Sequence, residues 1–91
     1  MNYKICYTKS YNRSAAKFLK LNLVLEEQYR KTLQLLELNP FHKSLRLHAI
    51  KSSFDNLYSV SINIKYRILI ILIIKDKTII PVSIGSHEQV Y

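Results

Sequence analysis

The 91-residue chain is long enough for one domain with a single hydrophobic core, and 48% of its residues are apolar. Its 14 Lys and Arg residues outnumber 6 Asp and Glu residues, and the resulting net charge of +8 favours a polyanionic or an acidic protein partner. The single glycine and the single cysteine exclude phosphate-binding loops, dinucleotide fingerprints, internal disulfides and cysteine-pair zinc sites.

The hydrophobic segments are too short for a membrane span. The longest apolar run, residues 68–74, has seven residues between Arg67 and Lys75, whereas a spanning helix needs about 20. The first residues interleave lysines with apolar side chains and contain no hydrophobic run typical of a signal peptide. These features predict a soluble protein. The single Cys6 is interpreted as a small core residue without a disulfide, which fits the reducing cytoplasm.

The chain begins with a predicted strand and a basic amphipathic helix. Residues 2–8 alternate in the period-2 pattern of a strand, and from about Ser10 the apolar residues recur at helical spacing. The opposite stripe of this helix consists of Lys9, Arg13, Lys17 and Lys20. A solvated face is the commoner role of such a stripe, but residues 1–25 contain no acid to pair with it, which favours a binding role.

A second helix is predicted from about Leu23 to Leu38. Glu26 and Glu27 lie in its first turns, where the helix dipole favours acidic side chains. Asn39-Pro40 ends the helix, because a residue before proline is disfavoured in the helical conformation. The short link between the two helices predicts an antiparallel hairpin.

After an extended or loop segment, residues 57–64 alternate as a strand. Their polar face includes Ser59 and Ser61, and we expect this face to be open and available for a functional site. Residues 66–74 are apolar on both faces beyond Arg67, which predicts a central strand that is covered on both sides.

A tight turn at residues 75–77 leads to a last strand at 78–85. Pro81 lacks the N–H that a sheet ladder needs, so it should sit at a bulge or an unpaired position. The order strand, helix, helix and three-stranded antiparallel meander predicts an α+β fold in one domain, residues 1–91, with the helix pair on one face of a twisted, largely antiparallel sheet.

The sequence does not favour metal chemistry. Asp55, Asp76 and Glu88 are scattered over different segments, which argues against a two-metal nuclease built on clustered carboxylates. The three histidines lie outside any recognisable ligand spacing. We therefore expect neither a metal nor a cofactor.

Cleaving RNA without a metal requires a base for the 2′-hydroxyl, a cation for the phosphorane and an acid for the leaving 5′-oxygen. Histidine suits the acid or base role because its pKa is about 6.5, and arginine can contact two phosphate oxygens at once. The candidates are His48, Arg67, His87 and Tyr91. Each also has a purely structural interpretation: Arg67 as the end of a hydrophobic strand, His48 as a loop residue and Tyr91 as a packing aromatic.

Three segments in the second half of the chain carry a family resemblance. NPFHKSLRLHAI (39–50), LYSVSINIKYRILI (57–70) and IGSHEQVY (84–91) resemble, in this order, motifs of the RelE/ParE superfamily of bacterial toxins, especially its RelE and YafQ-like messenger-RNA interferases. The family pattern has a proline after the helix hairpin, then Leu-x-x-His-x-Leu, a Tyr-Arg pair opening the central strand, and a terminal Ile-Gly-Thr-His-Asp-x-x-Tyr. The resemblance covers nearly the whole chain, and its specificity comes from the three linked motifs.

The resemblance implies a RelE-like fold and a toxin of a type II toxin–antitoxin system. Such a protein is a ribosome-dependent endoribonuclease that cuts mRNA in the A site and is neutralised by a cognate antitoxin. His87 is then the main general acid or base, Arg67 stabilises the phosphorane, His48 assists, and Tyr91 positions or stacks on the substrate. The RNA-binding or ribosome-binding candidates are Lys9, Arg13, Lys17, Lys20, Arg46, Lys51 and Lys65. Binding through them should weaken steeply with salt.

The chain departs from the family pattern on the strand at 57–64. RelE-type members have lysines there and YafQ-type members a histidine, whereas this chain has Ser59 and Ser61. Lys51 or Lys65 are candidates to replace the missing cation. Two alternatives stay open: a ParE-like toxin that inhibits DNA gyrase by binding, although ParE-type sequences generally lack the histidine and the terminal tyrosine, and a degenerate relative that binds only RNA or an antitoxin.

Gly85 is the only glycine of the chain. We expect its conformational freedom to let the chain leave the last strand and turn, so that His87 and Tyr91 project over the sheet beside Arg67.

Overall fold

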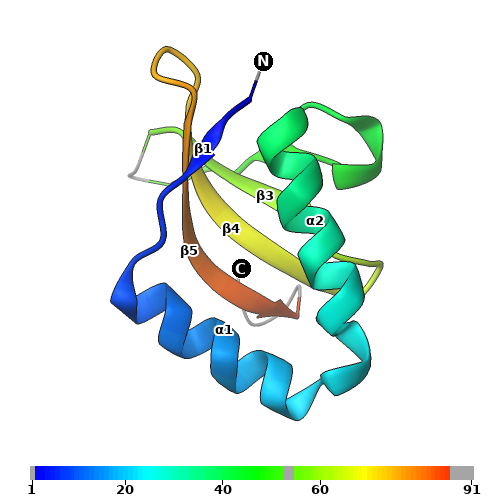
Figure 1. The fold of residues 1–91 in the computed structure, drawn as a ribbon. Helices are drawn as coiled ribbons and strands as arrows, with labels where there is room; N and C mark the ends of the chain where they lie inside the picture. The colour runs from blue at the N-terminus through cyan, green and yellow to red at the C-terminus, as the bar shows by residue number, and fades with distance from the viewer. Residues whose placement is uncertain (1, 53–54, 87–91) are drawn as a thin grey trace.

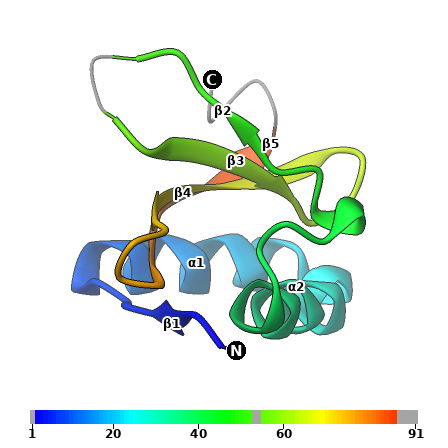
Figure 2. The ribbon, with the colours of Figure 1, turned by 90° about the horizontal axis from the view of Figure 1, so that it is seen from above.

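The computed structural model has two layers, a five-stranded sheet and two helices that cover one face of it (Figure 1, Figure 2). It describes residues 2–52 and 55–86. The elements are β1 (Lys4–Ile5), α1 (Lys9–Leu21), the 3₁₀ turn η1 (Leu23–Leu25), α2 (Glu26–Leu38), the 3₁₀ turn η2 (Lys43–Leu45), β2 (His48–Ala49), β3 (Leu57–Ser61), β4 (Tyr66–Ile73) and β5 (Thr78–Ser86). The predicted α+β class is confirmed.

The strands lie in the order β1-β5-β4-β3-β2, so β4 is central as predicted. Strands β3, β4 and β5 form the predicted antiparallel meander. Strand β1 pairs with β5 in parallel and is only two residues long, shorter than the predicted strand at 2–8. It ends early because the side chain of Thr8 accepts a hydrogen bond from the backbone N–H of Tyr11 at 3.0 Å, which starts α1.

Two features of the sheet lie in its second half. The edge strand β2, in the segment predicted as extended or loop, pairs with β3 through only two residues, which is too short for a period-2 pattern to predict. The predicted irregularity at Pro81 is confirmed: Ile70 pairs with Pro81 whereas Leu69 pairs with Ser83, so Val82 is an extra residue in β5. This bulge accommodates a residue that cannot donate to the ladder.

The predicted helix hairpin is also confirmed, and its helices splay apart from the link at η1 (Figure 1). The link is fixed by Asn22, whose side-chain amide donates to the carbonyl of Phe18 at 2.8 Å and accepts from the hydroxyl of Tyr66 at 3.3 Å. Neither described helix is long and apolar enough to cross a membrane.

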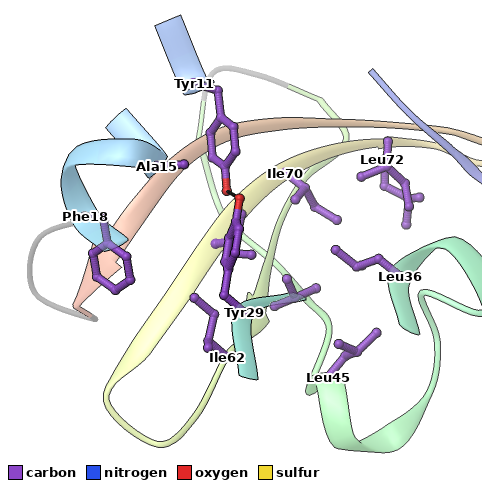
Figure 3. Packing of buried hydrophobic residues seen from close by; sticks show 12 residues of the cluster. Tyr11, Ala15, Phe18, Tyr29, Leu36, Leu45, Ile62, Ile70 and Leu72 are labelled. Carbon is purple, nitrogen blue, oxygen red and sulfur yellow. Dashed lines mark hydrogen bonds between the residues drawn. The ribbon is translucent and has the colours of Figure 1, made fainter. Parts of the chain in front are cut away.

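The core fills the space between the helices and the sheet, and every second residue of β3 and β4 points into it (Figure 3). Its buried members are Tyr11, Ala15, Phe18, Tyr29, Leu36, Leu45, Val60, Ile62, Ile68, Ile70, Leu72 and Ile79. This alternation assigns the intervening residues of β3 and β4 to the other face of the sheet.

One hydrogen bond in the core joins the two helices. The hydroxyls of Tyr11 and Tyr29 are 2.9 Å apart and buried (Figure 3). Burial raises the pKa of both tyrosines above the usual value near 10, because the phenolate would lose its hydration. Each hydroxyl therefore satisfies the other in a region that excludes water.

We expect Tyr11→Phe and Tyr29→Phe each to lower the free energy of unfolding by about 1–2 kcal/mol, because each leaves one buried hydroxyl unpaired. The double variant should lose less than the sum. Because the folded-state pKa values are raised, the stability from these tyrosines is present below pH 10 and lost as the pH rises above it. Urea unfolding at pH 7 and pH 11 measures both effects, and the double variant should lose less stability between these pH values than the native protein. Strictly additive single losses would contradict the pairing.

Candidate functional site

The face of the sheet that the helices leave uncovered, here called the site face, carries two of the predicted catalytic residues (Figure 2). Residues that pair directly across strands share a face. His48 pairs with Ser59, and Ser61 pairs with Arg67. Since Val60 between the serines points into the core, His48, Arg67 and both serines lie on the site face.

The separation of His48 and Arg67 follows from the register. His48 is aligned through Ser59 with Leu69, two strands away, and Arg67 lies two residues before Leu69. With about 4.8 Å between strands and about 3.4 Å per residue, the two Cα atoms are about 12 Å apart. A histidine and an arginine side chain can bridge this separation through one phosphate group.

The guanidinium of Arg67 is the electrostatic centre of the site face. Its Nε and Nη1 atoms are closed to solvent, and among the described residues neither has a hydrogen-bond partner. Carboxylates of α2 form ion pairs elsewhere, Glu26 with Arg30 at 3.2 Å and Glu27 with Lys31 at 3.4 Å. Unpaired buried donors of this kind are rare in native proteins and costly to maintain. Arg67 therefore carries a charge with two donors that no described residue satisfies.

The two serines are not free for use, so that expectation is wrong. Ser59 is 0% exposed and Ser61 is 8% exposed. The expectation took the polar face of β3 to be open. However, β2 pairs with the outer edge of β3, so Ser59 lies between two larger paired residues, His48 and Leu69. The hydroxyl of Ser61 donates to the carbonyl of Asn63 at 2.7 Å, whereas the hydroxyl of Ser59 has no partner within the described part of the chain.

His48 is exposed and held in one orientation by the turn that precedes it. Its Nδ1 lies 3.1 Å from the carbonyl of Arg46 and donates to it. Arg46 ends η2 in the left-handed region, with φ of 50°, which directs this carbonyl. The contact selects the tautomer with its lone pair on Nε2, so any proton transfer by neutral His48 uses that nitrogen.

The expectation that the chain leaves the last strand at Gly85 is also wrong, whereas the expected placement of His87 and Tyr91 lies outside the described residues. Strand β5 continues to Ser86, Gly85 pairs with Arg67 in the ladder, and its φ is not positive. Its position next to Arg67 on the site face gives the physical reason for a glycine. A glycine adds no side chain of its own beside the guanidinium.

The predicted RNA-binding cations are all exposed, but they lie in different places. Lys9, Arg13, Lys17 and Lys20 belong to α1 and therefore to the helix layer, across the sheet from Arg67. Arg46 and Lys51 flank β2, and Lys65 precedes β4 with its Nζ 5.3 Å from the ring centroid of Tyr66. The structure thus separates a basic helix from three cations near the strands of the site face.

Lys17 also borders a groove between α1 and the sheet. The groove has a volume of about 400 Å³, and its apolar lining includes Phe18, Leu21, Tyr66 and Ile84. It lies in the helix layer and is distinct from the site face.

His87 and Tyr91 lie outside the described residues, so their predicted roles stay predictions. Among residues 2–52 and 55–86, no three His, Cys, Asp or Glu residues group closely enough to hold a metal ion. The sequence did not reveal the unpartnered hydroxyl of Ser59. The one sequence signal for Ser59 is that it is a small polar residue in the strand next to the predicted central strand.

The fold is shared with solved toxin structures, although the sequence matches no model of a protein family and no characterised protein. A chain of the Escherichia coli DinJ–YafQ toxin–antitoxin complex superposes with a TM-score of 0.79 at 15% identity, covering 100% of this chain and 99% of that chain. The archaeal RelE–RelB complex from Pyrococcus horikoshii gives 0.72 at 18% identity, covering 94% and 96%. The YoeB–YefM complex from Staphylococcus aureus gives 0.71 at 18% identity, covering 96% and 99%. The chain therefore has the RelE-like fold that its motifs implied.

Proposed function

We propose that this chain is the toxin of a type II toxin–antitoxin system and acts as a ribosome-dependent mRNA endoribonuclease. One observation carries the proposal: a half-buried arginine, whose Nε and Nη1 atoms have no partner in the described chain, lies on the same sheet face as an oriented histidine. The chain matches, over nearly its whole length, structures solved as toxin–antitoxin complexes, which supports a cognate antitoxin as partner.

The proposed chemistry needs no metal. A base takes the proton of the 2′-hydroxyl, the 2′-oxygen attacks the phosphorus, and the bond to the 5′-oxygen breaks as an acid protonates that oxygen. The products are a 2′,3′-cyclic phosphate and a 5′-hydroxyl. Arg67 stabilises the phosphorane through its planar donors, His48 assists through Nε2, His87 is the main acid or base, and Tyr91 positions or stacks on the RNA.

The charge of the chain supports the proposed partners. The net charge is +8, and the basic stripe of α1 is exposed along its length. This stripe would contact ribosomal RNA in the active toxin and acidic residues of the antitoxin in the silenced one, both in the cytoplasm. An antitoxin segment that folds on binding could cover the stripe.

A catalytically weak relative is the second candidate, and one observation favours it. Neither Ser59 nor Ser61 supplies the cation or base that the family pattern has at these positions, and both are buried. Such a protein would bind RNA or the antitoxin without cutting mRNA. The experiment below separates this candidate, and a ParE-like gyrase inhibitor, from the proposed nuclease.

Induced expression is expected to arrest growth and to fragment translated mRNAs, and His87→Ala should relieve both, because the main proton-transfer group is removed. Primer extension on a translated transcript and on a copy without a start codon measures the cleavage. The matched control is His42→Ala, since His42 is exposed and its Nδ1 contacts Ser44, accepting from the backbone N–H at 3.2 Å and lying 2.9 Å from the hydroxyl; this variant should stay toxic. Intact transcripts under strong arrest would refute the nuclease, and inhibited supercoiling by gyrase would then support the ParE-like alternative.

A further inference from the structure

Three polar atoms without a partner in the described chain belong to two neighbouring residues of the site face. They are Oγ of Ser59 and the Nε and Nη1 atoms of Arg67, all closed to solvent and without a hydrogen bond in the described chain. Ser59 pairs with Leu69, two residues after Arg67 on the adjacent strand. Ser59 and Arg67 are therefore diagonal neighbours, with Cα atoms about 7–8 Å apart.

Burial on this face of β3 does not by itself leave a serine hydroxyl without a hydrogen bond. Ser61 is on the same strand and the same face and is also buried, yet its hydroxyl donates to the carbonyl of Asn63 at 2.7 Å. Ser59 thus lacks a bond that its neighbour makes. A buried polar group without a partner calls for an explanation, and a role in binding is one.

The donors of these groups match an oxyanion. A serine hydroxyl donates one hydrogen bond, and each guanidinium nitrogen of an arginine can donate to a phosphate oxygen in the plane of the group. Gly85, paired with Arg67, presents no side chain on this face that would occupy the same space. Hydrogen bonds from groups held out of bulk water are stronger electrostatically than the same bonds in water.

We propose that Ser59 and Arg67 together form a phosphate-binding site, in which the Ser59 hydroxyl donates to one non-bridging oxygen and Arg67 donates to another. The choice of phosphate as the ligand rests on the proposed function. In this site the neutral Ser59 hydroxyl contacts the phosphate in place of a second cation. Binding requires the side chains that close the site face to move apart, because the donors are closed to solvent in this structure.

Nitrogen NMR of the arginine side chains tests the site directly. The chain has four arginines, Arg13, Arg30, Arg46 and Arg67, so only a few Nε–H signals need assignment, and Arg67→Lys identifies the one from Arg67. On titration of the full-length ¹⁵N-labelled protein with inorganic phosphate at constant ionic strength, this signal should shift and saturate. A signal of Arg67 that does not respond would overturn the proposal.

Ser59→Ala is the decisive variant and Ser61→Ala its matched control. Ser59→Ala should weaken phosphate binding at Arg67 by about tenfold, the loss of one hydrogen bond to a charged ligand, without lowering the thermal unfolding midpoint. Ser61→Ala should lower the midpoint, since its bond to Asn63 is lost, and leave phosphate binding unchanged. Equal phosphate affinity in Ser59→Ala and the native protein, or equal weakening in both variants, would refute the role of Ser59.

The outcome is distinguishable from a failure of the proposed function. If phosphate binds as described but translated mRNA stays intact, the site stands and the nuclease does not. If mRNA is cut and Ser59→Ala matches the native protein in both cleavage and phosphate affinity, the nuclease stands and the site does not.

Discussion

Arg67→Met is expected to slow mRNA cleavage strongly while leaving the free energy of unfolding unchanged or raised. Removing a preorganised donor to a charged transition state typically costs about 10²–10³ in rate. The same guanidinium has two buried nitrogens without a partner in the described chain, and each such group typically costs about 1–3 kcal/mol of stability. Methionine keeps most of the apolar stem and removes these donors. Cleavage on purified ribosomes and urea unfolding measure the two effects.

Two further variants separate charge from geometry. Arg67→Lys keeps the positive charge but not the planar fork, so it should recover only a small part of the activity. Arg30→Met removes an arginine that is paired with Glu26 on the exposed side of α2, and it should leave both cleavage and stability nearly unchanged. A large loss of stability in Arg67→Met, with cleavage retained, would make Arg67 a structural residue.

The pairing of lost activity with retained stability is what distinguishes a functional group from a packing group. Most of the chain follows the ordinary rules, since apolar side chains fill the core and a proline sits at a bulge. Arg67 and Ser59 break these rules on the central strand and its neighbour. Proteins that tolerate such violations usually do so where they bind or react.

The elements that the sequence predicted well are those with a long, regular pattern. The alternating or continuous apolar residues of 57–64 and 66–74 locate two strands, although β3 ends at Ser61, three residues before the predicted end. Pro81 has a backbone constraint that requires an irregularity wherever it occurs. Strand β2 could not be predicted, because two residues carry no period and its formation depends on pairing with a strand ten residues later.

The candidate site was predictable in part for the same reason. The alternation of β4 points Tyr66 and Ile68 to the helices and Arg67 away from them. The face of His48 depends on its long-range pairing with Ser59, and the burial of Ser59 depends on neighbours from two other strands. Gly85 was misassigned because a glycine in a strand can serve a turn or leave space, and only the register with Arg67 distinguishes these roles.

Leu36→Ala should lower the free energy of unfolding by about 2–5 kcal/mol, because it opens a cavity in the core. Leu36 is 0% exposed and joins α2 to the sheet-facing core (Figure 3). A small domain has a total stability of about 5–15 kcal/mol, so a large fraction of it would be lost. Urea unfolding at one temperature measures the loss.

Leu38→Ala is the matched control, since it is the same substitution two residues later in α2, at a side chain that is 62% exposed. We expect it to change stability by less than about 0.5 kcal/mol. Equal losses in both variants would mean that α2 is not docked through Leu36. In cells Leu36→Ala should also reduce toxicity, but through a lower amount of folded protein. The shift of the Arg67 Nε–H signal on addition of phosphate should therefore persist in the fraction of Leu36→Ala that remains folded.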